Sequence, residues 1–214
     1  ASDNTVALWN VRNRQLIATM RGHSSRITGV VFLSEGEVLA SGSDDGTVRL
    51  WQLSAEAEPE WASVRLQSSV AFSPKGDFAA SGGKSGVTLW NVQTGDGVCN
   101  LEYGTGDDFA GDKPVGSWRL DFSPDGRYLA AGSRGNTLTL YPITGGALWE
   151  QGVAGDILTV AVAENGAIIV AGTNDNEIAA FSGGGLPLWT ATAGSDVVST
   201  AISDDGSFVV AGSL

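Results

Sequence analysis

Few side chains in this sequence have the chemistry of a catalytic or metal-binding group. His23 is the single histidine and Cys99 the single cysteine among the 214 residues. A serine or cysteine nucleophile needs a histidine that is free to accept its proton, so only His23 could serve such a site. One histidine and one cysteine are too few for a typical zinc site, and a lone cysteine cannot form an intrachain disulfide. We therefore expect no metal and no cofactor.

Carboxylates are more abundant, and a pair of them could hydrolyse glycosides. That chemistry needs two carboxyl groups about 5–9.5 Å apart in different environments. Asp121 together with Asp156 or Asp196 are the candidate pairs, and Trp118 is the nearby aromatic residue that could stack on a sugar ring. A carbohydrate-binding or glycoside-hydrolysing protein is therefore one alternative.

A second acidic group lies in the stretch GTGDDFAGDKPVG at 104–116. Asp107, Asp108 and Asp112 could bind Ca²⁺ there, but their spacing lacks the Asp-x-Asp-x-Asp-Gly pattern of a strong site. A solvated loop is the favoured interpretation, and ion binding by this loop stays open.

A repeated pattern of turns and strands must position these side chains. Each copy combines a turn glycine, an apolar segment with Ala-Gly or Ser-Gly, a second turn and a segment that ends in an aromatic residue. The turn glycines are Gly36, Gly76, Gly126, Gly166 and Gly206, spaced by 40, 50, 40 and 40 residues. The copies read LASGSDDGTVRLW at 39–51, FAASGGKSGVTLW at 78–90, YLAAGSRGNTLTLY at 128–141 and IIVAGTNDNEIAAF at 168–181. A fifth copy begins as FVVAGSL at 208–214 and continues as SDNTVALW at 2–9.

This pattern predicts an all-β fold. Alternating apolar segments between Gly, Asp, Asn and Pro are typical of short strands. A period near 40 indicates repeats that bury their faces only against their neighbours. We predict a five-bladed β-propeller of four-stranded antiparallel blades, with a last blade that takes strands from both termini and so has no free edges. The single domain is 1–214, with approximate blades 26–66, 67–104, 117–152, 155–193, and 196–214 plus 1–22.

The first strand of each predicted blade lines a central channel. Small side chains are expected on the channel side, because five strands crowd round one axis. Arg119 and Asp121 are the exceptions. An ion pair that plugs the channel is one interpretation, and contact with an anion or another ligand is the other. Arg26, Asp156 and Asp196 precede inner strands in register, so we expect them to form a polar rim at the channel mouth.

The first half of the sequence resembles the WD-repeat family. The resemblance rests on Gly22-His23, on ASGSDDGTVRLW at 40–51, on ASGG and VTLWNV within 80–92, and on SDNTVALWNV at 2–11. It implies a β-propeller whose first blade carries a hydrogen-bonded tetrad of His23, Ser41, Asp45 and Trp51. A structural histidine of this kind is no catalytic base. The second blade has no Gly-His pair and carries Lys84 where the aspartate is expected.

From about residue 120 the sequence looks more like the quinoprotein-type propeller repeats. GGALW at 145–149 and GGLPLW at 184–189 place Trp149 and Trp189 40 residues apart, on expected fourth strands. WD-repeat proteins usually have seven blades rather than five. A chimeric or engineered propeller with no evolved function is therefore a further alternative, and a part of a larger ring stays open as well.

Composition limits the class of partner. The net charge is −12 and the pI is near 4.3, so the protein is expected to repel phosphate backbones and anionic membranes. No apolar run of 18 residues and no signal-peptide pattern is present in the sequence. We therefore expect no nucleic-acid and no membrane partner. The compartment is unknown, with the cytoplasm favoured.

The leading functional prediction is a non-enzymatic scaffold that binds a protein or peptide on its loop-rich face. Turns on a rigid ring present fixed side chains at little ordering cost, and loops are where function usually lies. We expect a monomer, with a dimer as the alternative, and the partner's identity stays open. The predicted binding residues of this face and the channel are Arg26, Asp44, Phe109, Trp118, Arg119, Asp121, Asp156 and Asp196.

Overall fold

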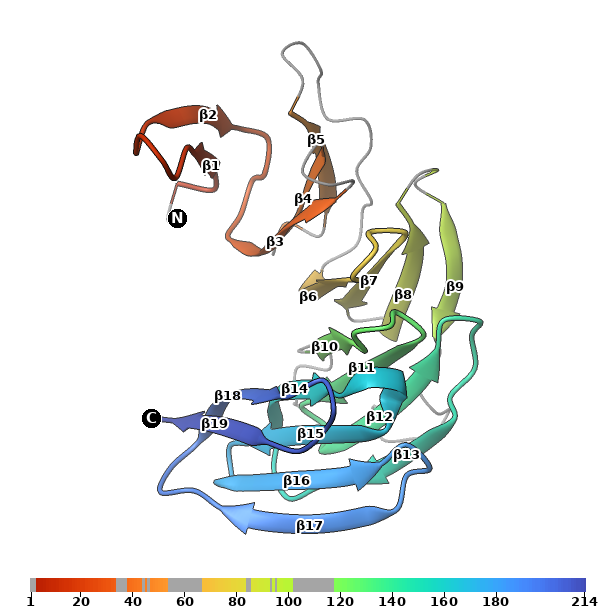
Figure 1. The fold of residues 1–214 in the computed structure, drawn as a ribbon. Coiled ribbons are helices and arrows are strands. Elements are labelled where there is room, and N and C mark those ends of the chain that lie inside the picture. The colour runs from red at the N-terminus through yellow and green to blue at the C-terminus, as the bar shows by residue number, and fades with distance from the viewer. Residues whose placement is uncertain are drawn as a thin grey trace.

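The computed structural model is a succession of antiparallel β-sheets, which confirms the all-β prediction. It describes residues 3–33, 38–43, 45, 47–53, 67–83, 86–92, 94, 96–101 and 118–214. The expected loop 104–116 and the turn at Gly36 lie outside the described residues. The strands of every sheet pair in the order in which they occur along the chain, so each sheet is an antiparallel meander (Figure 1).

The described sheets, in chain order, have the following bounds. The first two are β1 (Val6–Trp9) with β2 (Leu16–Met20), and β3 (Ile27–Leu33) with β4 (Val38–Ser43) and β5 (Val48–Gln52). Two four-stranded sheets follow: β6 (Gln67–Phe72), β7 (Phe78–Gly83), β8 (Gly86–Asn91), β9 (Gly97–Leu101), then β10 (Trp118–Phe122), β11 (Tyr128–Ser133), β12 (Thr137–Pro142), β13 (Trp149–Gly152). The last two are β14 (Ile157–Val162), β15 (Ile168–Thr173), β16 (Glu177–Ser182), β17 (Pro187–Thr192), and finally β18 (Val197–Ile202) with β19 (Val209–Ser213).

The first strand of each repeat lies on the inner side of an arc of sheets (Figure 1). Inner strand β3 lies beside β6, β6 beside β10, β10 beside β14, and β14 beside β18. The outermost strands, such as β13 and β17, form the rim of the arc. This arrangement of four-stranded antiparallel sheets is consistent with a β-propeller.

One type of turn recurs in the four described connections between a first and a second strand and explains the spacing of their glycines. Gly126 has φ of 73°, in the left-handed region that favours glycine, and its N–H donates to the Ser123 carbonyl at 2.8 Å. The N–H of Ser123 then donates to the Tyr128 carbonyl at 2.9 Å and closes the hairpin. The same pair of bonds recurs at 73–78, 163–168 and 203–208. The glycines therefore recur in the sequence because the same hairpin recurs in the structure.

Glycines in the second strands allow neighbouring blades to approach closely. A Cβ atom on Gly42 would clash with Val70 of the next blade, and a Cβ on Gly132 would clash with Ile157. A Cβ on Gly172 would likewise clash with Val197 of the next blade. These contacts belong to apolar layers between the sheets, and the largest described layer includes Ile157, Val160 and Ile169. The blades are therefore held together by packing of one sheet on the next.

The two end sheets have unpaired outer edges. Among the described residues, β19 pairs only with β18 and β1 pairs only with β2. Figure 1 shows these sheets on opposite sides of the opening in the arc. The fifth blade that the sequence predicts from these four strands is thus held as two separate half-blades, and its closure stays a prediction.

Candidate functional site

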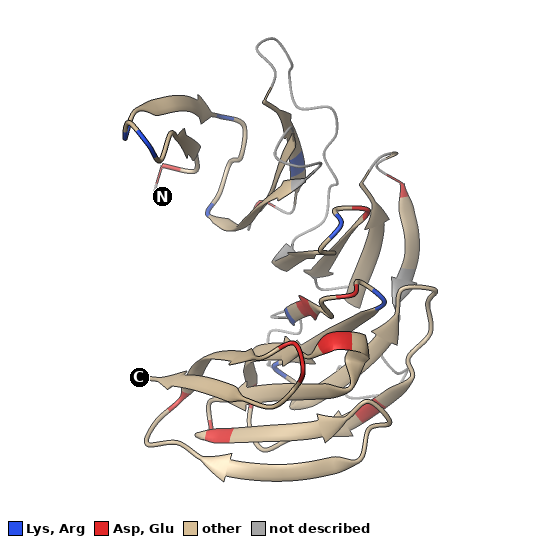
Figure 2. Cartoon of the chain, viewed as in Figure 1, with Lys and Arg blue, Asp and Glu red and all other residues tan. Residues whose placement is uncertain are grey.

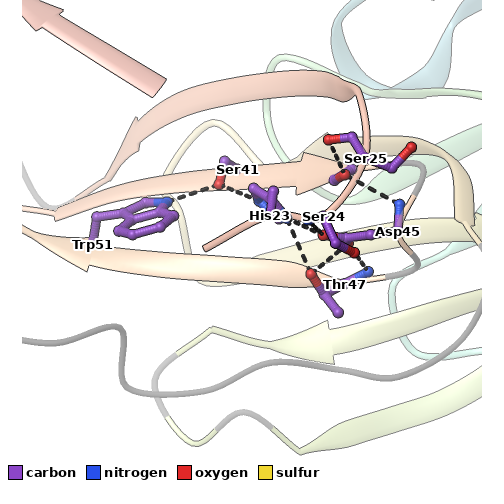
Figure 3. Close-up of polar contacts among 8 residues, drawn as sticks. His23, Ser24, Ser25, Ser41, Asp45, Thr47 and Trp51 are labelled. Carbon is purple, nitrogen blue, oxygen red and sulfur yellow. Dashed lines mark hydrogen bonds and ion pairs between the residues drawn. The ribbon is translucent and has the colours of Figure 1, made fainter. Parts of the chain in front are cut away.

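The four residues of the expected tetrad meet at the sheet of β3, β4 and β5 (Figure 3). Trp51 Nε1 donates to Ser41 Oγ at 2.7 Å, and Ser41 Oγ lies 2.8 Å from His23 Nε2. His23 Nδ1 lies 2.9 Å from Asp45 Oδ2. With a neutral ring, every donor is satisfied when the Ser41 hydroxyl donates to Nε2 and Nδ1–H donates to Asp45. The tetrad is a relay that joins β5 and β4 to the loop before β3.

Asp45 is the fixed end of this relay. Its carboxylate also accepts hydrogen bonds from the Ser24 N–H at 2.8 Å and from the Thr47 hydroxyl at 2.6 Å. Burial alone would raise the pKa of Asp45, but the bonds from Thr47, Ser24 and His23 lower it to about 2. The carboxylate is therefore ionised at neutral pH and orients the imidazole.

The geometry assigns His23 no free nitrogen for catalysis. The side chain of His23 is 1% exposed, and both ring nitrogens lie within hydrogen-bond distance of a side-chain oxygen. Among the described residues, the second blade shows the first step of the relay, in which Trp90 Nε1 donates to Ser81 Oγ at 2.7 Å. This agrees with the missing Gly-His pair in that repeat.

Arg119 and Asp121 bind the neighbouring blade rather than each other. Arg119 Nε donates to the Leu158 carbonyl at 2.6 Å, and the Val162 N–H donates to Asp121 Oδ2 at 3.0 Å. Within the described part of the chain, no ion pair joins the two side chains. The ion-pair interpretation is therefore not what the structure shows, because the backbone of β14 offers both groups a partner.

Arg119 and Asp121 lie in opposite electrostatic surroundings. Burial lowers the pKa of Arg119, and the positive charges of Arg134 and Arg26 lower it further. Burial raises the pKa of Asp121 to about 6, against the N–H bonds from Val162 and Phe122. A raised folded-state pKa means that ionised Asp121 destabilises the fold, so its penalty appears as the pH rises from about 4 through 6.

The predicted rim residues lie where the inner strands begin. Arg26 directly precedes β3, Asp156 precedes β14 and Asp196 precedes β18. The Asp156 N–H donates to Asn174 Oδ1 at 2.7 Å, and the Asp196 carbonyl accepts from the Leu214 N–H at 3.2 Å. The three residues are thus at the same end of the inner strands as His23.

Other predicted residues lie outside the described part of the structure. Asp44 and Phe109 are not described, and neither are Lys84 and the acidic residues of 104–116. Trp118 is the first residue of β10, and its side chain is not described. Their roles stay predictions.

The candidate glycosidase pairs are not brought together. Asp121 accepts a bond from Val162 at the end of β14, whereas Asp156 lies before the start of that strand. A strand rises about 3.3 Å per residue, so about 20 Å of strand separates the two levels. Asp196 lies at the same level as Asp156, before β18. Both separations exceed the range that paired carboxyl catalysis requires.

Two residues near the channel were missed by the sequence reasoning. Arg134, in the turn between β11 and β12, acts on Arg119 through its charge. Asp204, in the turn between β18 and β19, lines a cavity together with Asp121. Both occupy turn positions where charged residues are common, so no sequence signal distinguished them from solvated turn residues.

Three further observations concern metal binding, membrane spans and the cysteine. Among them, no three His, Cys, Asp or Glu side chains are grouped closely enough to hold a metal ion. The same part of the chain has no helix with the length and apolar character that a membrane span needs. Cys99 is half-buried, and burial raises the pKa of its thiol, which lowers its thiolate fraction and hence its reactivity.

Comparison with known proteins places both halves among propeller repeats. Residues 14–52 and 63–91 match the family described as WD domain, G-beta repeat, and residues 105–213 match the family described as Outer membrane protein assembly factor BamB. The chain is 32% identical over 161 residues to the Periodic tryptophan protein 2 homolog of Schizosaccharomyces pombe, covering 67% of this chain and 18% of that protein. It is 48% identical over 56 residues to the Nuclear distribution protein nudF of Emericella nidulans, covering 26% and 12%. It is 32% identical over 102 residues to the Protein transport protein sec13 of Aspergillus oryzae, covering 42% and 35%.

The aligned part of the chain thus spans 35% or less of each of these relatives. The BamB-type match alone takes in residues 105–213, just over half of the 214 residues. The WD-repeat matches account for much of the remainder, and the tetrad geometry lies within them. The chain belongs to the repeat β-propeller proteins, with WD repeats in its first part and BamB-type repeats in its second half.

Proposed function

We propose that this protein is a non-enzymatic scaffold that binds a protein or peptide on the face that carries the His23 loop. WD-repeat relatives support protein binding in general, and two of those named above are a nuclear distribution protein and a protein transport protein. The structural role of His23 and the distance between the channel carboxylates favour binding over catalysis.

The observation that carries this proposal is a group of three arginines at the channel mouth. Arg26, Arg119 and Arg134 come from two different blades, yet Arg26 and Arg134 both lower the pKa of Arg119. The net charge of the chain is −12, so a group of cations distinguishes this mouth from the predominantly acidic remainder. Guanidinium groups bind carboxylates in a paired geometry, so a partner that carries carboxylates matches the chemistry of this mouth. We therefore expect an acidic peptide segment as the partner.

Charge reversal at this mouth should remove the binding of acidic peptides. Peptides would be selected on the wild-type protein from a random dodecapeptide library and then titrated by fluorescence anisotropy. Arg26→Glu combined with Arg134→Glu should lower the affinity for the selected acidic peptides at least tenfold, because the substituted carboxylates repel the acidic side chains that the arginines attract. Arg127→Glu is the matched control, since Arg127 is exposed in the turn between β10 and β11, at the other end of the inner strands. Selection of peptides without acidic residues, or an equal loss in the control, would contradict the proposed face.

A rigid binding face also requires a closed ring, and we infer that the two half-blades complete one blade. Gly212 of β19 corresponds to Gly42 and Gly172, but no neighbouring blade lies near it among the described residues. Val30 of β3 corresponds to Val70, which packs on Gly42, yet Val30 is 55% exposed. In the proposed closed form Val30 packs on Gly212, and β19 pairs with β1.

The exposed side chains of the open ends support this closure. Phe32 on one side of the opening is 56% exposed, and Phe208 and Val210 on the other side are 74% and 69% exposed. Contact between these surfaces would remove large apolar side chains from water, which is favourable in proportion to the area buried. The closed ring would also remove the unpaired edges of β1 and β19.

A further inference from the structure

A cavity of about 350 Å³ opens at the opposite end of the inner strands from the three arginines. It lies where β10, β14 and β18 end, next to the turns that lead to their second strands. Its exposed lining is about equally polar and apolar, and the apolar part includes Pro124, Ala201 and Ile202. Its volume is within the range of small-ligand sites.

The polar groups of this cavity are carboxylates and a hydroxyl. Asp121, Asp204 and Thr200 line it, and the described residues of its wall include no lysine, arginine or histidine. Figure 2 shows acidic segments in β10, in the turn between β18 and β19, and in the short helix η2 (Glu164–Gly166) close by. The potential in the cavity is therefore negative.

Asp121 is poorly compensated as an anion. The neighbouring strands β14 and β18 contain no charged residue, and Asp204 adds a second negative charge. Arg119 lies on the same strand as Asp121, but its Nε donates to the Leu158 carbonyl, toward the other end of the channel. Burial raises the pKa of Asp121 accordingly. The Val162 N–H bond compensates part of the cost of burying this ionised carboxylate, and a cation paired with it would offset more.

We propose that this cavity binds an organic cation, an alkylammonium or guanidinium group on an apolar stem. The charged head pairs with Asp121, and the stem packs on Pro124, Ala201 and Ile202. Lysine and arginine side chains have this chemistry, because their methylene stems bury against apolar surface while the head stays polar. The site is separate from the proposed scaffold face, since it lies at the other mouth of the channel.

Isothermal titration with three small probes tests the proposal on the full chain. The probes are n-butylammonium, Nα-acetyl-lysine N-methylamide and neutral n-butanol. Both cations should bind saturably at one site, and n-butanol should not bind measurably. Equal affinity of the two cations would indicate a free amine as the natural ligand, whereas tighter binding of the lysine derivative would indicate a peptide side chain. Absence of saturable binding of both cations would overturn the proposal.

Matched variants locate the site. Asp121→Asn should lower the affinity for both cations at least tenfold, because it removes the charge that pairs with them. The variant should still fold, because Asn keeps an oxygen that can accept the Val162 N–H bond. Asp205→Asn removes the same charge from an exposed residue that does not line the cavity, and should change affinity less than twofold. Ala201→Leu fills the cavity from an exposed wall position and should abolish binding of both cations. Unchanged affinity in Asp121→Asn or Ala201→Leu, or an equal loss in Asp205→Asn, would contradict the site.

Binding of acidic peptides at the arginine face should persist in all three variants, which separates this test from that of the scaffold.

Discussion

Deletion of residues 1–12 should convert a monomer into oligomers and aggregates rather than merely lower its melting temperature. The deletion removes β1, whose Val6 is 6% exposed and packs with Leu39 and Trp51. It also leaves β2 and β19 without the strand that we propose pairs with both. Unpaired strand edges recruit other chains, so exchange between copies is the expected outcome. Size-exclusion chromatography with light scattering measures the mass directly.

The control for this deletion is a chain that lacks only the first two residues. It keeps β1 and should remain monomeric with the melting temperature of the full chain. A monomeric chain without residues 1–12 that melts at an unchanged temperature would show that β1 contributes nothing to closure.

His23→Ala should destabilise the fold by about 1–3 kcal/mol, the cost of leaving buried polar groups without their partner. The lost partners are Ser41 Oγ and the Asp45 carboxylate, both in the relay shown in Figure 3. Denaturant unfolding at pH 7 gives the free energy. Binding of acidic peptides should be retained well below the melting temperature, since His23 only positions the loop.

A double-mutant cycle tests whether the relay acts as a unit. His23→Ala and Asp45→Asn should be less destabilising together than the sum of the single changes, because each removes the same hydrogen bond. Asp45 contributes stability that is present above pH 4 and lost as the pH falls through about 2, since its folded-state pKa is lowered. If His23→Ala abolished peptide binding with no loss of stability, His23 would be a contact residue instead.

Local patterns made the repeat architecture predictable from the sequence. The turn glycines repeat because Gly76, Gly126, Gly166 and Gly206 all have φ between 62° and 74° in one hairpin type. The tetrad was predictable through the resemblance of the first half to WD repeats, which assigned roles to His23, Ser41, Asp45 and Trp51. The turn glycines depend on short-range geometry, whereas the tetrad needed the family pattern, because His23 lies 18 residues before Ser41 and 22 before Asp45.

Contacts between blades were less predictable. Arg119 and Asp121 lie two residues apart on one strand face, which suggested an ion pair, but β14 places a carbonyl and an N–H nearer to them. The contribution of Arg134 and the cavity beside Asp204 also depend on how three blades converge. No pattern within a single repeat contains that information.

Closure of the ring is tested most directly by a disulfide across the opening. In a Cys99→Ser background, Ser199→Cys and Val30→Cys would be introduced together and oxidised at low protein concentration. Thr159→Cys with Thr200→Cys is the matched control, because these residues hold the corresponding positions on two neighbouring inner strands and their hydroxyl oxygens lie 3.0 Å apart. We predict that both pairs form a disulfide within one chain, seen as faster migration on a non-reducing gel and as a raised melting temperature. An intrachain bond in the control pair, with Ser199→Cys and Val30→Cys either reduced or linked between two chains, would contradict the closed ring.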